Sequence, residues 1–198
     1  MARLQTTDLL LSEPISALAL PVLNDAYHEQ TSAFNIRSIG TMICRKANFA
    51  DLERITSLLQ EEDLRPEGVL EPSTHYWVAE EADKLLSSVG LELGAKSALL
   101  RSAIVEPQSR GQGIGRQLAT EALDWAKKEG FRAAYCLSTH AGSYWLRLGF
   151  RVCPVDEVGA ELKDAPQMGL FHELGWLPTE VAFKMHLSDH TAGLSQPN

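Results

Sequence analysis

Three glycines and an arginine stand close together in the stretch QSRGQGIG, residues 108–115, directly after a run of strand-forming residues. Glycine has no Cβ, so a loop with glycine at every second position lets its backbone come close to a ligand. Phosphate groups suit such a loop when a helix begins behind it, because the first N–H groups of the helix point at the ligand. The spacing of the residues decides which phosphate ligand fits.

Two nucleotide-binding motifs do not fit this loop. A Walker loop ends in Gly-Lys followed by Ser or Thr, and no such pair follows these glycines. A dinucleotide loop needs a third glycine where Arg116 or Leu118 stands. The remaining pattern is Arg-x-x-Gly-x-Gly, from Arg110 to Gly115. Backbone N–H groups and the helix dipole at such a site bind a diphosphate without a divalent metal, and the alternative is a plain glycine turn.

Strands and helices alternate on both sides of the loop. After a short strand from Met42, Asn48 is the expected N-cap of a helix with an apolar face at Leu52, Ile55, Leu58 and Leu59. A second helix is predicted from Gly113 to about Glu129, a short one at 141–148, and a weaker helical stretch near 159–174. The other predicted strands are 74–81, 84–93, 97–105, 133–138, 150–155 and 180–187. This order predicts an α/β fold, a mixed sheet with helices packed on its faces.

Composition narrows the class of protein. The chain has 198 residues, 44% of them hydrophobic, which suits one domain with a proper core. Its net charge of −8, without a strong Lys/Arg run, argues against nucleic acid as a partner. Cys44, Cys136 and Cys153 are odd in number and lack C-x-x-C spacing, so we expect buried thiols in a reducing compartment, the cytoplasm, and no metal.

The two ends of the chain differ from its centre. The segment MARLQTTDLLLSEPISALALPVL has apolar patches, but Glu13 and Pro14 interrupt them, so neither a signal peptide nor a membrane span is predicted. We expect a flexible extension at 1–40, a domain at 41–187 and a disordered tail at 188–198.

The stretch LLRSAIVEPQSRGQGIGRQLATEAL, followed after a strand by AGSYWLRLGF, resembles the GCN5-related N-acetyltransferases (GNAT). The resemblance covers about 41–187 and implies the GNAT fold, a central, mixed, splayed β-sheet with helices on both faces. The strings ALLRSAIV, DLRPEGV and RLGFRVCPVDE are most similar to acetyltransferases of arsenic-resistance type. Cofactor use follows from this resemblance: acetyl-CoA as acetyl donor, and no metal.

The resemblance assigns the acetyl-CoA site. The pyrophosphate would lie on backbone N–H groups of the loop, and the pantetheine arm would pair with the main chain of the strand before it. Ser138 stands where many members carry an Asn that holds the pantetheine or the following turn. The cofactor-binding residues implied are Ala103, Ile104, Val105, Arg110, Gly111, Gln112, Gly113, Ile114, Gly115 and Ser138.

The catalytic helix departs from the family pattern. The Tyr that protonates the departing thiolate in the family aligns with Trp145, whose indole N–H is no acid at neutral pH. Tyr144 is about 100° around the helix, so we expect it to pack rather than to catalyse. A general acid contributes about 10²–10⁴-fold, so its loss slows the reaction without forbidding it.

Arg101 is the predicted catalytic and substrate-binding side chain. In a regular strand residues 99, 101, 103 and 105 share one face, which would place Arg101 beside the cofactor, aimed at an acidic group of the acceptor. The alternative is a structural ion pair with Glu92. Glu67 and His140 are further substrate-binding candidates, in loops that border the same cleft, as do Arg65 and His75.

The resemblance therefore implies transfer of an acetyl group to the primary amine of a small acceptor, an amino acid or an amino-acid-like arsenical or phosphinic compound. An acetyl-CoA-binding sensor without catalysis and a protein or polyamine N-acetyltransferase are the alternatives. The expected partners are a small-molecule amine and a second copy of the chain, with no membrane and no nucleic acid.

Overall fold

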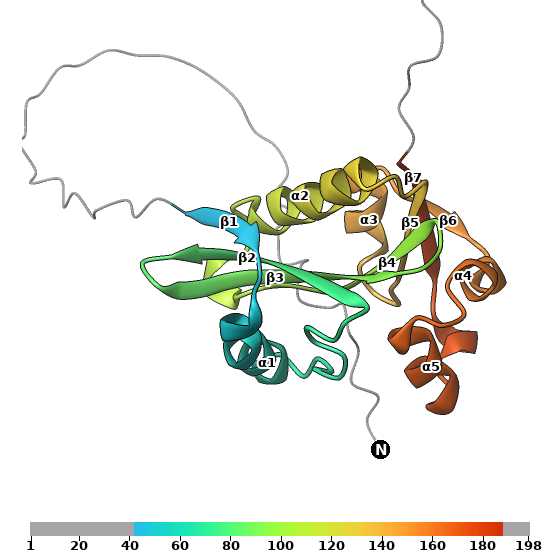
Figure 1. Cartoon of the computed structure of the whole chain (residues 1–198), viewed down its shortest axis with the longest axis horizontal. Helices are drawn as coiled ribbons and strands as arrows, with labels where there is room; N and C mark the ends of the chain where they lie inside the picture. The colour runs from blue at the N-terminus through green and yellow to red at the C-terminus, as the bar shows by residue number, and fades with distance from the viewer. Residues whose placement is uncertain (1–41, 188–198) are drawn as a thin grey trace, which may run out of the picture.

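The computed structural model describes residues 42–187; the predicted extension at 1–40 and the tail at 188–198 lie outside the described residues. Its centre is a seven-stranded sheet in the order β1-β2-β3-β4-β5-β7-β6 (Figure 1). The strands are β1 Ile43–Lys46, β2 Thr74–Glu81, β3 Lys84–Leu93, β4 Ser97–Val105, β5 Ala133–Leu137, β6 Arg151–Cys153 and β7 Ala182–His186.

The helices form two layers around the sheet. Helices α2 and α3 lie over one face of it, and α1 and α5 lie on the other side (Figure 1). Their bounds are α1 Leu52–Glu61, α2 Ile114–Lys128, α3 Gly142–Leu148, α4 Val155–Glu161 and α5 Pro166–Glu173. The α/β class, the mixed sheet and the helices on both faces are as predicted.

Helix α1 begins one short element later than the sequence indicates. Asn48 caps a 3-10 turn, Phe49–Asp51, by accepting a hydrogen bond from Ala50 N, and Asp51 completes a capping box with the Asn48 backbone. The predicted helical stretch near 159–174 is two helices, α4 and α5. Pro166 starts the second one, because proline fits the first turn of a helix and not its interior.

The sheet opens between β4 and β5, its parallel pair. The two strands are paired only over Ser97–Leu100 and Ala133–Cys136. Beyond Leu100, β4 continues to Val105 along β3, while β5 ends at Leu137. The edge of β4 that faces β5 therefore loses its strand partner where the glycine loop approaches.

A β-bulge in β4 changes which side chains share a face. The register with β3 shifts between Ser88 and Gly90, and Ser102, opposite this shift, has a φ of 50°. Leu100 and Ala103 both pack in the core under α2, whereas regular alternation would place them on opposite faces. The prediction that Arg101 shares a face with residues 103 and 105 is therefore wrong, because the bulge adds one residue between them.

Candidate active site

The glycine loop adopts the backbone conformation that its sequence indicates. Gly111 and Gly113 have φ angles of 75° and 79°, which L-residues with a side chain rarely adopt, and a Cβ at either position would enter open space. The first hydrogen bond of α2 runs from Gln117 N to Gly113 O. The N–H groups of residues 114–116 precede this ladder, so they are donors for a ligand at the start of the helix.

Arg110 fixes the loop by its side chain. Its Nε donates to Val105 O at 2.9 Å, and its Nη2 forms an ion pair with Glu62 Oε2 at 2.8 Å. Both side chains are mostly buried, so the guanidinium ties the loop to the end of β4 and to the C-terminal end of α1. The loop thus offers its backbone to a ligand while this arginine holds it from behind.

A pocket of about 290 Å³ adjoins the loop. Gly111, Gly113 and Val105 line it together with Arg116 of α2 and Arg147 of α3. The loop N–H groups, the α2 dipole and these two arginine side chains favour an anion. The full lining is Val105, Ser109, Arg110, Gly111, Gly113, Ile114, Gly115, Arg116, Tyr144, Arg147 and Leu148.

Tyr144 lines this pocket, which the sequence did not predict. Its Oη is buried and has no hydrogen-bond partner. Burial, reinforced by Cys136, raises the pKa of Tyr144 to about 12, against the opposing effect of Arg116 and Arg147. The phenol therefore stays protonated at neutral pH and keeps a hydrogen-bond donor that has no partner in the described residues.

Trp145, the next residue of α3, lines a different pocket. Its indole is 1% exposed, packs edge-on against Phe150, and has an Nε1 without a partner. It lines a second, small pocket of about 10 Å³ at the point where β4 and β5 part. The other lining residues are Leu100, Arg101, Ser102, Ala103, Leu137 and Gln167.

Arg101 is held by the protein itself. Its Nη1 forms an ion pair with Glu92, its Nη2 donates to Glu67 O at 2.7 Å, and its Nε donates to Ser102 Oγ at 3.2 Å. Both charged side chains are almost fully buried. The structure thus places Arg101 in the ion pair that was the alternative to substrate binding, so we do not carry it forward as the anchor of an acidic acceptor.

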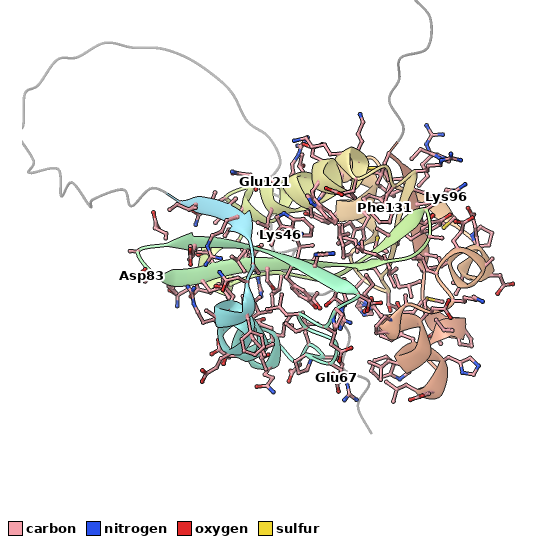
Figure 2. The ribbon with its side chains drawn as sticks, viewed as in Figure 1. Lys46, Glu67, Asp83, Lys96, Glu121 and Phe131 are labelled. Atoms are coloured by element: carbon pink, nitrogen blue, oxygen red, sulfur yellow. The ribbon has the colours of Figure 1, made fainter. Side chains whose placement is uncertain are left out.

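The remaining predicted residues fall into different surroundings. Ser138 Oγ accepts a hydrogen bond from Ala141 N, so this side chain holds the turn before α3. Ile104 packs on the α1 side of the sheet, away from the loop pocket. Glu67 and His140 are exposed, and Figure 2 shows Glu67 on the loop that follows α1, where its carboxylate contacts Arg65.

Metal and thiol chemistry find no support in residues 42–187. No group of three or more His, Cys, Asp or Glu side chains there could hold a metal ion. Burial raises the pKa of Cys44 to about 11 and that of Cys136 well above its ordinary value. These thiols stay protonated at neutral pH and are poor nucleophiles.

The fold and the site combine a helix start that suits a diphosphate with a parting of two parallel strands. The family model "Acetyltransferase (GNAT) domain" matches residues 72–152, the segment from β2 through the loop to β6. This match agrees with the predicted class, an acetyltransferase of GNAT type. A comparison with curated protein sequences finds no match.

Solved structures share the fold at low sequence identity. N-acetylglutamate synthase from Neisseria gonorrhoeae, complexed with coenzyme A and N-acetyl-glutamate, has a TM-score of 0.63 at 20% identity over 75% of this chain. This chain spans only 36% of the length of that protein. Rv2747 from Mycobacterium tuberculosis, in complex with CoA, has a TM-score of 0.57 at 19% identity, over 74% of this chain and 99% of its own.

A third structure belongs to an enzyme with a protein substrate. The ribosomal-protein-S18-alanine N-acetyltransferase from Escherichia coli has a TM-score of 0.56 at 14% identity, and the match covers 80% of this chain and all of that one. At such identities these structures establish a common fold, and their different acceptors leave the acceptor of this protein to be argued from its own site.

Proposed function

We propose that the protein is an acetyl-CoA-dependent N-acetyltransferase that acetylates the α-amino group of a small, amino-acid-like acceptor. The observation that carries the proposal is the junction of two features, the glycine loop at the start of α2 and the parting of β4 from β5. The loop suits the pyrophosphate of acetyl-CoA, and the parting suits its thioester.

The residues of the larger pocket fit the donor. Backbone N–H groups of the loop and of the first turn of α2 would hold the pyrophosphate, with Arg116 and Arg147 beside them. The main chain of Ala103 and Val105 would pair with the pantetheine arm, because β4 has no strand partner on that side beyond Leu100. The donor supplies an acetyl group as a thioester, and the N–H groups near the bulge in β4 are placed to stabilise its carbonyl oxygen as negative charge develops.

Trp145 has a role in this scheme that differs from that of a tyrosine. Its unpartnered Nε1–H is a hydrogen-bond donor at the parting of the strands, so it stabilises the departing thiolate without giving up a proton. A thiol with a pKa of about 8.5 leaves as the thiolate at a penalty of about 2 kcal/mol at pH 7, and the thiolate then takes its proton from solvent. The reaction proceeds without a general acid and is slower for its absence.

The small pocket indicates the class of acceptor. Its lining contains no carboxylate or imidazole, and the charge of Arg101 is neutralised by Glu92. An ammonium group therefore gains no ion pair there, and the acceptor must arrive as a free amine. An α-amino group, with a pKa of about 7.7–8.0, reaches that state at neutral pH far more readily than a lysine side chain, with a pKa of about 10.4.

The identity of the acceptor within this class is a hypothesis drawn from similarity to other proteins. Two structures of N-acetylglutamate synthase hold N-acetyl-glutamate and L-arginine, which are amino acids or their products. The resemblance to acetyltransferases of arsenic-resistance type suggests amino-acid-like arsenical or phosphinic compounds. Binding of their acidic group by Arg101 has no support here, because that guanidinium is bound within the protein. A cytoplasmic location and pairing of two chains also stay predictions.

Release of free thiol from acetyl-CoA tests the proposal. The purified chain is mixed with acetyl-CoA and with L-glutamate, L-arginine, glycinamide, spermidine or butylamine, and mass spectrometry identifies the acetylated product. The expected result is faster release with the three α-amines than with butylamine or spermidine. Release of free thiol with spermidine and with none of the other amines would support the polyamine alternative and contradict an α-amine as the acceptor.

One observation favours a second candidate, an acetyl-CoA-binding sensor without catalysis. Trp145 occupies the position at which the family has its acid tyrosine, and its side chain is buried in the core. A sensor would bind acetyl-CoA tightly and release no thiol with any of these amines. The two candidates thus differ in a single assay.

A further inference from the structure

Two residues that each carry an unpartnered polar atom line the same small pocket. Within residues 42–187, three buried side-chain polar atoms have no hydrogen-bond partner: Tyr144 Oη, Trp145 Nε1 and Gln167 Oε1. Tyr144 lines the loop pocket, whereas Trp145 and Gln167 line the pocket at the parting of β4 and β5. A buried polar atom left without a partner costs about 1–3 kcal/mol, so such atoms call for a ligand or another explanation.

Gln167 reaches this pocket from an element that the sequence did not connect with catalysis. It is the second residue of α5 and is 3% exposed. Its backbone N donates to Glu92 Oε2 at 2.9 Å, across 75 positions of the chain. The start of α5 is therefore attached to the C-terminal end of β3.

The buried ion pair holds this attachment in place. Glu92 accepts from Gln167 with one carboxylate oxygen and from Arg101 with the other. Arg101 also binds the carbonyl of Glu67, so the segment after α1 and the start of α5 meet on the same pair. This gives Arg101 a positioning role, because it fixes the backbone that carries Gln167 without contacting the acceptor.

We propose that Gln167 Oε1 accepts a hydrogen bond from an N–H of the acceptor amine and thereby directs its lone pair at the thioester carbonyl. The proposal rests on the proposed function and names a residue that recognises the amine. An acceptor amine keeps N–H groups while it attacks, whereas the thioester carbonyl and sulfur have none. A lone carbonyl oxygen at this place is thus matched to the amine and not to the donor.

The electrons and protons of the step balance without a further reactant. The amine lone pair forms the N–C bond, and the carbonyl π electrons move to oxygen. They return as the C–S bond breaks, and its electron pair leaves with sulfur. The nitrogen loses one proton to water, and the thiolate gains one from water. Gln167 takes no proton, since an amide is not basic; its oxygen stabilises the positive charge that develops on nitrogen.

Two substitutions of Gln167 test the proposal: both keep the length of the side chain, but only one of them keeps an oxygen that can accept a hydrogen bond. Gln167→Met keeps the length and removes the acceptor oxygen, and Gln167→Glu keeps an acceptor oxygen in either protonation state. Gln60→Met, on the exposed face of α1, is the matched control. The probe is whichever of L-glutamate, L-arginine and glycinamide gives the fastest thiol release with the wild-type chain.

We expect Gln167→Met to lower kcat/KM for the amine by about 10- to 100-fold, Gln167→Glu to lower it less, and Gln60→Met to leave it unchanged. Two measurements besides activity distinguish this role from a structural one. The calorimetric Kd for acetyl-CoA should be the same in all four proteins. The melting temperature of Gln167→Met should equal or exceed that of the wild type, since the lost oxygen has no partner.

The possible outcomes distinguish failure of the proposed role of Gln167 from failure of the proposed function. A Gln167→Met variant that acetylates the probe amine within twofold of the wild-type rate overturns the role of Gln167 and leaves the proposed function standing. A variant with a lower melting temperature and weaker acetyl-CoA binding would show a structural glutamine and also overturn it. A wild-type chain that acetylates none of the three amines removes the proposed function, and the inference with it.

Discussion

Tyr144 and Trp145 are neighbours in α3, yet the two residues line different pockets. The Tyr144 phenol lines the anion-favouring pocket beside the loop, and the Trp145 indole lines the pocket at the parting of the strands. One residue of offset on a helix turns a side chain by about 100°, which accounts for the separation. The offset predicts that the phenol of Tyr144 serves cofactor binding and not thiolate protonation.

Substitution of Tyr144 by Phe tests this assignment. It removes one buried oxygen without a partner, so the unfolding free energy of the ligand-free protein should stay the same or rise by up to about 1 kcal/mol. The affinity for acetyl-CoA should fall about 3- to 10-fold if the phenol donates a hydrogen bond to it. Calorimetry and denaturant unfolding measure the two effects. Equal affinity of the variant and the wild type would show that Tyr144 only packs.

The pH dependence of stability gives a second test at this residue. Because burial raises the pKa of Tyr144 to about 12 from an ordinary value of 10.0, the folded protein retains the phenol proton that the unfolded chain loses. The stability that this group contributes is present below pH 10 and falls, by at most about 1.4 kcal/mol per pH unit, as the pH rises toward 12. Subtracting the Tyr144→Phe curve from that of the wild type isolates this slope; parallel curves above pH 10 would contradict the raised pKa.

Single residues differ in how well their role could be predicted from the sequence. The conformations of Gly111 and Gly113 are local, so their spacing was enough to place the loop at the start of a helix. Gln167 gave no signal, because its importance comes from Glu92, a residue far away in the chain. Tyr144 was predicted only to pack, since the alignment with the family pointed to its neighbour.

At the scale of elements, the buried Arg101–Glu92 pair joins β3, β4, α5 and the segment after α1. Removing one partner leaves the other as an uncompensated buried charge. We therefore expect Arg101→Met to lower the unfolding free energy by about 3–5 kcal/mol, and the double variant Arg101→Met with Glu92→Leu to recover part of the loss. Urea unfolding of the three proteins measures this.

Arg101→Lys separates this structural role from the substrate-binding role that the sequence favoured. Lysine has one charged group in place of the planar fork and cannot bond Glu92, the Glu67 carbonyl and Ser102 together. A loss of stability together with slower acetylation of acidic and uncharged amines alike fits the ion pair. A variant that unfolds like the wild type and discriminates only against acidic amines would restore Arg101 as an acceptor anchor.

The elements themselves could largely be predicted, and their exceptions have physical causes. The hairpin of β2 and β3 follows from alternation and from a turn at Ala82 and Asp83, both with positive φ. The bulge at Ser102 could not be predicted, because nothing in SALLRSAIV differs from a regular strand. Its conformation is held by the adjacent Arg101 and by Tyr76 of β2 and Ser88 of β3.

In the whole molecule, two groups of elements approach β4 and β5 from opposite faces of the sheet. The loop, α2 and α3 form the pocket that suits the donor, while α5 and the segment after α1 meet on the other face of the sheet (Figure 1). Within residues 42–187 no helix is long and apolar enough to span a membrane. The pairing of β4 with β5 was predictable as a GNAT feature, whereas the packing of α4 and α5 beyond it was not.

Calorimetric titration of acetyl-CoA into the wild-type chain and into Gly113→Val measures whether the glycine loop holds the cofactor. We expect one site per chain in the wild type. We expect no measurable binding in a folded Gly113→Val, since a branched side chain at a φ of 79° strains the loop and occupies space that is open beside it. NAD and ATP should show no comparable affinity. Equal affinity of a folded Gly113→Val for acetyl-CoA, or binding of NAD or ATP as tight as that of acetyl-CoA, would contradict a role of the loop in holding acetyl-CoA.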